Sequence, residues 1–146
     1  MNRIPDTVRQ TVRERGLYRC EYCLKPEFMS ASQFHVDHIR PPMHGGDSEL
    51  HNLAWACVDC NVHKGTNIAS YDHITGEMTP LFNPRIYQWK DHFALTNAEI
   101  IGITTIGRIT VRLLDVNSPH QIQARRIVLD LERRGLYTPP EGSFRP

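Results

Sequence analysis

Two Cys-x2-Cys pairs constrain this chain more than any other feature of its sequence. They contain all of its cysteines, and 33 residues separate the second cysteine of one pair from the first of the other: Cys20, Cys23, Cys57 and Cys60. Two such pairs can present four thiolates tetrahedrally to Zn²⁺, whereas disulfides need an oxidising compartment that nothing in the sequence indicates. We therefore predict a structural zinc site that fastens a small domain and holds an insert at both ends.

The chain has 146 residues, of which 40% are hydrophobic, and this is enough for one ordinary domain. We predict a single domain over residues 1–146, with a core at 20–67, a C-terminal extension at 68–137 and a loose tail at 138–146. No apolar run is long enough to cross a bilayer, and the N-terminus has no secretory apolar region. We expect a cytoplasmic protein without a membrane partner.

The formal net charge is only +1, but it is unevenly distributed along the chain. Residues 1–19 carry five Arg and two acids, and residues 108–146 carry seven Arg and four acids, so each flank is +3. Residues 20–107 carry five basic and ten acidic residues, which gives −5 before any bound metal is counted. This pattern favours an acidic, metal-binding centre between arginine-rich flanks, with ordinary solvated surface charge as the alternative for any single Arg.

The insert between the cysteine pairs carries residues suited to phosphodiester hydrolysis. Residues 33–39 are typical of a short strand, in which alternation sends Asp37 and His38 to opposite faces unless a bulge or the strand end re-aims them. Asp37 offers a hard oxygen ligand for Mg²⁺ or Mn²⁺, and His38 offers a neutral base near pH 7.

Three polar residues further along extend this candidate site. Asn61 follows the second cysteine pair, at the start of a helix that zinc would fix in space, and offers a second oxygen ligand. The amide of Asn52 is expected to hold its loop and to orient the His38 ring through a hydrogen bond. Lys64 is expected to contact phosphate, since its charge does not depend on pH in this range.

The other histidines near the site are expected to have local surface or packing roles, with contact to phosphate or to the surroundings of a second metal as the alternative: His35, His44 and His63. Asp72 and His73 repeat the Asp-His dipeptide, but they precede Ile-Thr-Gly-Glu. That sequence is typical of a hairpin turn, so we do not expect a second catalytic pair there.

From Cys20 to Gly65 the sequence resembles the HNH, or ββα-metal, endonuclease family. The resemblance implies that Asp37 is a metal ligand, that His38 is the general base and that Asn52 orients this base. Asn61 matches the final metal-ligand position, where many members of the family have His. An amide oxygen at this position favours Mg²⁺ over softer metals.

We therefore expect a small α+β protein, with a zinc-fastened ββα-metal core, an N-terminal helix and a C-terminal strand-helix extension. The expected function is metal-dependent hydrolysis of phosphodiester bonds in DNA, with duplex DNA as the expected partner, by an HNH endonuclease. The alternative is a non-catalytic zinc module that binds nucleic acid or protein. Such a module has no need of the Asp, His and two Asn residues together.

Both flanks are expected to contain helices. Thr7 and Gln10 have the spacing of a capping box and Gly16 is a natural stop, so residues 6–15 should be helical. The arginines of this helix are expected to face away from its narrow apolar stripe. The helix is expected to dock on the domain surface, with phosphate contact as the alternative.

The extension is expected to begin with strands at 78–82, 93–96 and 100–104, a turn at 96–99 and a helix at 106–113. Tyr87 and Trp89 are expected to be packing residues, with a place on the nucleic-acid-binding face as the alternative.

A last helix is expected to start after a capping Ser118, with Pro119 at its first position, Gln121 completing a capping box and Gly135 just past its end. Its expected apolar stripe consists of Ala124, Ile127, Val128 and Leu131. Arg125 and Arg126 would then lie on other faces, where we expect them to bind DNA phosphates. Arginines in the last turn of a helix also interact favourably with the helix dipole, so they need no phosphate partner.

Overall fold

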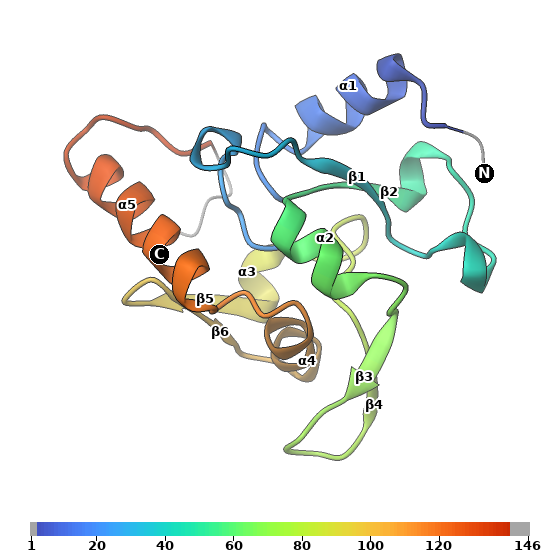
Figure 1. The fold of residues 1–146 in the computed structure, drawn as a ribbon. Coiled ribbons are helices and arrows are strands. Elements are labelled where there is room, and N and C mark those ends of the chain that lie inside the picture. The colour runs from blue at the N-terminus through green and yellow to red at the C-terminus, as the bar shows by residue number, and fades with distance from the viewer. Residues whose placement is uncertain (1–2, 141–146) are drawn as a thin grey trace.

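The computed structural model describes residues 3–140 and shows a small α+β fold (Figure 1). Its helices are α1 (Asp6–Arg15), α2 (Val58–Lys64), α3 (Trp89–His92), α4 (Thr105–Leu113) and α5 (Pro119–Arg133), with short 3-10 turns at Glu27–Met29, Pro42–His44 and Leu50–Asn52. Its strands are β1 (His35–His38), β2 (Leu53–Ala56), β3 (Ala69–Tyr71), β4 (Met78–Pro80), β5 (Phe93–Thr96) and β6 (Glu99–Gly102). The strands pair consecutively into two-stranded antiparallel sheets throughout the described residues.

The centre of the fold is a ββα unit made of β1, β2 and α2 (Figure 1). In the β1–β2 ladder Asp37 lies opposite Ala54 and His38 lies opposite Leu53. All four residues of β2 are buried, because α1 covers this hairpin. The predicted strand at 33–39 is therefore present, although its ladder is shorter than predicted.

Helix α1 has the predicted bounds, but its predicted capping box is wrong. The N-cap is Pro5, which carries no side-chain acceptor, and Thr7 already lies inside the helix, where its carbonyl accepts a hydrogen bond from Thr11. The helix ends at Gly16 as predicted. A Cβ there would lie 2.9 Å from the Cβ of Trp55, so glycine permits close approach of α1 to β2.

The arginines of α1 tie the helix to the core. The guanidinium of Arg9 lies 4.7 Å from the ring centroid of Trp55 and donates to the carbonyl of Phe34 at 2.7 Å. Arg13 forms an ion pair with Glu27 at 2.9 Å, and Arg15 donates to two carbonyls of the 50–53 segment. These contacts confirm a docked helix.

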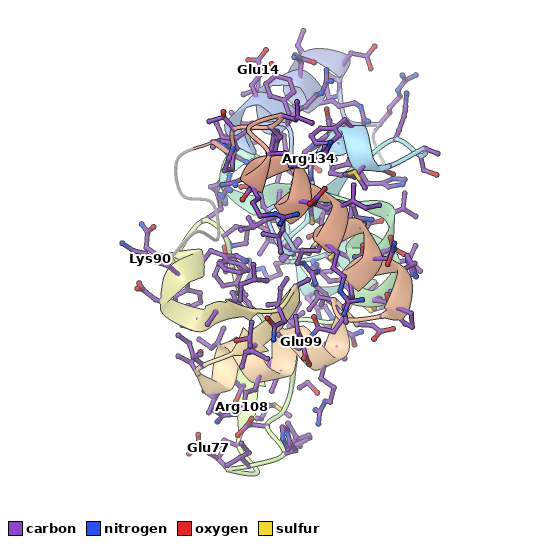
Figure 2. The ribbon with its side chains drawn as sticks, turned by 90° about the vertical axis from the view of Figure 1, so that its left-hand side faces the viewer. Glu14, Glu77, Lys90, Glu99, Arg108 and Arg134 are labelled. Carbon is purple, nitrogen blue, oxygen red and sulfur yellow. The ribbon has the colours of Figure 1, made fainter. Side chains whose placement is uncertain are left out.

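The β3–β4 hairpin contains the second Asp-His dipeptide, and its role is structural, as predicted. The Asp72 carboxylate accepts hydrogen bonds from the backbone and hydroxyl of Thr75 and a bidentate pair from Arg108 on α4, at 2.9 and 3.0 Å. The hydrogen bonds from Arg108 hold the pKa of Asp72 well below its ordinary value. Figure 2 labels Arg108 on α4 and Glu77 in the hairpin that it fastens.

The rest of the extension follows the prediction in part: β5 has the predicted bounds, β4 and β6 each end two residues earlier than predicted, and α3 and β3 were not predicted. The β5–β6 hairpin turns at Asn97 and Ala98, which both have positive φ, and α4 begins one residue before its predicted start. Trp89 donates from its indole nitrogen to the carbonyl of Tyr22 at 2.9 Å, and Tyr87 packs against Phe82. Both aromatic residues therefore contribute to packing.

Helix α5 has the predicted extent but a different buried face. Its buried residues are Gln121, Arg125, Val128 and Glu132, spaced four, three and four apart. Only Val128 of the predicted apolar stripe is fully buried, and Ile127 is 42% exposed. The helix ends as predicted, with Gly135 at φ +71° just beyond it. Figure 2 shows α5 along the side that faces the viewer, with Arg134 labelled at its end.

One buried cluster joins the ββα unit to the extension. It includes the four cysteines, Trp55, Phe82, Phe93, Ile100 and Ile109, among other residues. Of the expected loose tail at 138–146, residues 141–146 lie outside the described residues. Within residues 3–140 no helix is long and apolar enough to cross a membrane.

Candidate metal centres and active site

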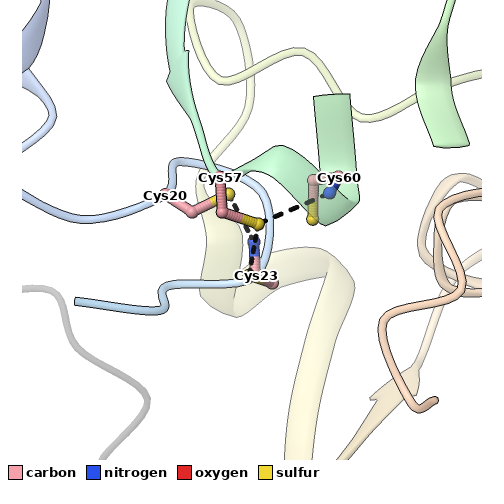
Figure 3. A group of neighbouring side chains, drawn as sticks. All are labelled: Cys20, Cys23, Cys57 and Cys60. Atoms are coloured by element: carbon pink, nitrogen blue, oxygen red, sulfur yellow. Dashed lines mark hydrogen bonds between the residues drawn. The ribbon is translucent and has the colours of Figure 1, made fainter. Parts of the chain in front are cut away.

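The four cysteines converge in one buried cluster, drawn in Figure 3. All four sulfur atoms lie within 4.8 Å of one another, and the sulfurs of Cys23 and Cys57 are 3.7 Å apart. Tetrahedral Zn²⁺ with Zn–S bonds of about 2.3 Å sets its sulfurs roughly 3.8 Å apart, whereas a disulfide joins them at about 2.05 Å. The cluster therefore fits a structural zinc ion.

The surroundings of the sulfurs also fit a cation. Within each pair the backbone N–H of the second cysteine points at the sulfur of the first, at 3.5 Å for Cys23 and 3.4 Å for Cys60. Burial raises the pKa of the Cys20 thiol, whereas hydrogen bonds from the neighbouring thiols lower the pKa of Cys23. A bound Zn²⁺ would offset the cost of burying the four cysteines as thiolates.

A residue that the sequence did not indicate completes the zinc environment. The side-chain nitrogen of Gln121 lies 3.9 Å from the sulfurs of both Cys23 and Cys57. The capping box predicted for this glutamine is wrong, because the amide turns inward to the thiols and Ser118 makes no side-chain cap. Helix α5 therefore packs against the cysteine cluster.

Asp37 is the centre of the second candidate site. It projects from β1 into the interior and is only 4% exposed. Its Oδ2 accepts a hydrogen bond from the Tyr22 hydroxyl at 2.6 Å, and its Oδ1 lies 3.2 Å from the Lys64 ammonium. Burial raises the pKa of Asp37, against the opposing effects of Lys64 and Tyr22.

Asn61 lies beside Asp37, as the proposed pair of metal ligands requires. Its side-chain nitrogen is 3.5 Å from Oδ1 of Asp37, and a half-turn of the amide places its oxygen there instead. Two oxygens that each bind Mg²⁺ at about 2.1 Å are separated by no more than about 4.2 Å. With the amide turned, the spacing of the two side chains is compatible with a shared hard divalent ion, beside which the Lys64 ammonium also contacts Oδ1.

His38 faces the loop that precedes β2. Its Nε2 lies 3.0 Å from the hydroxyl of Ser48, and the ring is half-buried. Strand alternation thus separates the two side chains, as the sequence predicts. Ser48 itself was not predicted, because only the path of the loop brings it to the ring.

The prediction that Asn52 bonds the His38 ring is wrong. The Asn52 amide accepts from the backbone nitrogen of Arg40 at 2.9 Å and donates to the carbonyls of Arg40 and Asp47 at 2.9 and 2.7 Å. The other half of the prediction is confirmed, since these bonds hold the loop. Because Asp47 precedes Ser48, Asn52 positions the His38 ring only indirectly.

Two of the three predicted phosphate contacts are also wrong. Lys64 is 1% exposed and donates to Asp37 and to the carbonyl of His38 at 2.9 Å. Arg125 is 6% exposed and donates to the carbonyls of Ala98 and Val116 at 2.6 and 2.8 Å. Buried cations with these partners cannot reach a DNA backbone. Arg126 is exposed, so its predicted role stays a prediction.

The remaining histidines near the site have local surroundings. His44 lies 2.9 Å from the carbonyl of Thr66, and His63 lies 2.8 Å from the carbonyl of Asp59. His35 is the first residue of β1, and its side chain is exposed.

Comparison with protein families identifies the segment that contains both candidate centres. Residues 20–67 match the family model of the HNH endonuclease. The match supports a nuclease-type function that acts on nucleic acid. No curated protein and no solved structure matches the chain. The HNH segment holds the ββα unit and the cysteines, whereas the flanking helices and the extension lie outside it.

The buried Lys64–Asp37 pair in the HNH segment gives a first prediction. We expect Lys64→Met to lower the free energy of unfolding by about 3–5 kcal/mol, because a buried carboxylate loses its cation. Urea unfolding of the zinc-loaded protein, without other added metals, measures this loss. Lys90→Met changes an exposed lysine of α3 and is the matched control. Equal stability of Lys64→Met and the unaltered protein contradicts a stabilising role for this pair.

Proposed function

We propose that this protein is a metal-dependent endonuclease that hydrolyses phosphodiester bonds in DNA, with duplex DNA as its substrate. The observation that supports it best is the placement of Asp37 and His38 at the end of β1. Asp37 lies against Asn61 on α2, while the half-buried ring of His38 faces the loop. Asp37 can thus bind a hard metal ion while the neighbouring His38 accepts a proton. DNA as the substrate follows from the resemblance to HNH endonucleases.

In the proposed mechanism His38 accepts a proton from the attacking water. If the ring donates from Nε2 to the Ser48 hydroxyl, Nδ1 keeps the free lone pair that acts as the base. As the oxygen of this water forms its bond to phosphorus, the bond between phosphorus and the leaving oxygen breaks. Ser48 and the Asn52-held loop keep the ring in one orientation, which lowers the entropic cost of proton transfer.

Asp37 and Asn61 provide the oxygen ligands for the second metal. A bound Mg²⁺ or Mn²⁺ supplies stabilisation of the charge that develops on the phosphate and on the leaving oxygen. The zinc cluster has a structural part in this proposal, because it fixes the first turn of α2 and therefore the position of Asn61. Arg126 is proposed to contact the DNA backbone from the exposed face of α5.

The direct test is cleavage of supercoiled plasmid by the zinc-loaded protein with added Mg²⁺ or Mn²⁺. We expect nicked or linear product with added metal and none without it. Asp37→Ala should need much more Mg²⁺ for half-maximal cleavage, because this change removes a metal ligand and lowers the affinity for Mg²⁺. Excess Mg²⁺ should therefore restore part of its activity. Asp91→Ala changes an exposed aspartate of α3, is the matched control and should keep the original Mg²⁺ dependence.

Zinc content of every sample shows whether the protein is folded. A zinc-loaded protein that binds DNA but never cleaves it with any divalent ion would instead favour a non-catalytic nucleic-acid-binding module. Full activity of Asp37→Ala at low Mg²⁺ would leave a nuclease but remove Asp37 from its metal site.

A further inference from the structure

The side chains that donate hydrogen bonds to the Asp37 carboxylate come from the first cysteine pair and from α2, the helix that carries the second pair. Tyr22 lies between the two cysteines of the first pair, Cys20-Glu-Tyr-Cys23. Asn61 and Lys64 lie on α2, whose first turn contains the second pair. A carboxylate on β1 is therefore held by both halves of the zinc cluster.

Tyr22 is fixed by its surroundings. It is 2% exposed, and its backbone carbonyl accepts the indole N–H of Trp89. The cysteines on either side belong to the buried cluster. The ring therefore has little freedom to move independently of the zinc site, and its hydroxyl reaches Asp37 from a set position.

The hydrogen bond from Tyr22 also determines which oxygen of Asp37 is available. At 2.6 Å it has the length of a hydrogen bond to a charged oxygen, and it occupies Oδ2. Oδ1 is consequently the oxygen that faces α2. Oδ1 accepts from the Lys64 ammonium at 3.2 Å and from the Asn61 side-chain nitrogen at 3.5 Å. A half-turn of the Asn61 amide removes the second donor and directs the amide oxygen to the same place, which leaves one acceptor position of Oδ1 for a metal ion.

We propose that Tyr22 is a positioning residue for the divalent metal site, whose hydroxyl holds Asp37 with Oδ1 directed toward Asn61. The zinc cluster then has a second role, since it sets the geometry of the neighbouring metal site through Tyr22. Tyr22 acts through Asp37 and touches neither the substrate nor the reacting atoms. This inference rests on the proposed function, because it requires Asp37 to bind a divalent ion.

The experiment compares Tyr22→Phe with the unaltered protein by direct metal binding. Free Mn²⁺ is followed by electron paramagnetic resonance as zinc-loaded protein is titrated, without DNA. Removal of the hydroxyl should weaken Mn²⁺ binding about 10- to 100-fold, the usual loss when a hydrogen-bond partner of a metal ligand is removed. Tyr71→Phe changes an exposed tyrosine of β3 and should leave Mn²⁺ binding unchanged.

The outcomes separate this inference from the proposed function. Unchanged Mn²⁺ affinity in zinc-loaded Tyr22→Phe overturns the role of Tyr22 and leaves the nuclease proposal intact. Absence of Mn²⁺ binding by the unaltered protein overturns the metal site itself, and the role of Tyr22 with it. Loss of cleavage alone, with Mn²⁺ binding as expected, affects only the nuclease proposal.

A second measurement does not depend on the folding of Tyr22→Phe. When a divalent ion binds Asp37, the charge on the hydrogen-bond acceptor of Tyr22 changes, and the ultraviolet absorption of the buried ring should shift. Mg²⁺ added to the zinc-loaded unaltered protein should produce a saturable tyrosine difference spectrum, and Asp37→Asn should abolish it. Saturable Mg²⁺ binding without any tyrosine signal overturns the inference.

Discussion

His38→Ala is expected to lower the rate of plasmid cleavage by about 10²- to 10⁴-fold, the usual loss when a general base is removed. The imidazole contacts Ser48 and lies apart from the Asp37 carboxylate and the Asn61 amide. The metal ligands should therefore be unaffected, so Mn²⁺ and DNA should bind as tightly as before. Single-turnover cleavage at saturating Mg²⁺ measures the chemical step without interference from binding.

Two comparisons make this result specific. Raising Mg²⁺ should restore no activity to His38→Ala, whereas it should restore part of the activity of Asp37→Ala. His35→Ala removes an exposed histidine from the same strand and should cleave at the original rate. Equal rates for His38→Ala and the unaltered protein would leave a nuclease whose base is another group.

The parts of the fold that could be predicted are those encoded by local signals. The end of α1 follows from Gly16, whereas its start was predicted from a capping box that does not form. The β5–β6 hairpin follows from two short apolar runs around Asn97. The four cysteines were predicted to share one metal because their spacing has few other uses. Asp37 and Asn61 could be paired because α2 starts at the second cysteine pair.

Hydrogen-bond partners could not be predicted where they depend on the path of a loop. Asn52 has the residue type to orient His38, but the loop brings the backbone of Arg40 and Asp47 to its amide first. Ser48 then reaches the imidazole. The local sequence does not distinguish the predicted arrangement from the observed one, because each gives the Asn52 amide hydrogen-bond partners.

Charge was the least reliable guide to the site. A count along the sequence treats every Lys and Arg as available to a phosphate. Lys64, however, pairs with Asp37, and Arg125 donates to the carbonyl of Ala98, each 27 residues earlier in the chain. The face of α5 was mispredicted for the same reason. Gln121 faces the thiols of Cys23 and Cys57, and Arg125 donates to the carbonyls of Ala98 and Val116, which a search for an apolar stripe cannot reveal.

Cys57→Ser is expected to abolish stoichiometric zinc and cooperative unfolding together. Structural zinc contributes about 10–16 kcal/mol in small zinc domains, as much as or more than the roughly 5–15 kcal/mol total stability of an ordinary domain. Metal analysis of protein purified under reducing conditions should find one zinc per chain in the unaltered protein and none in the variant. Near-ultraviolet circular dichroism during heating should show a sharp transition only in the former.

Cys57 is the most informative of the four cysteines because it has a second role that serine can keep. It is the N-cap of α2, and its sulfur accepts a hydrogen bond from the backbone nitrogen of Cys60. Serine is a favourable N-cap, so Cys57→Ser should retain the cap and lose only the metal ligand. As a control, zinc returned to the chelator-treated unaltered protein should restore the transition, and zinc added to the variant should not. A variant that unfolds cooperatively without zinc would show that the hydrophobic core around Trp55 is sufficient to hold α2 and the extension in place. The cysteine cluster would then be dispensable for the fold.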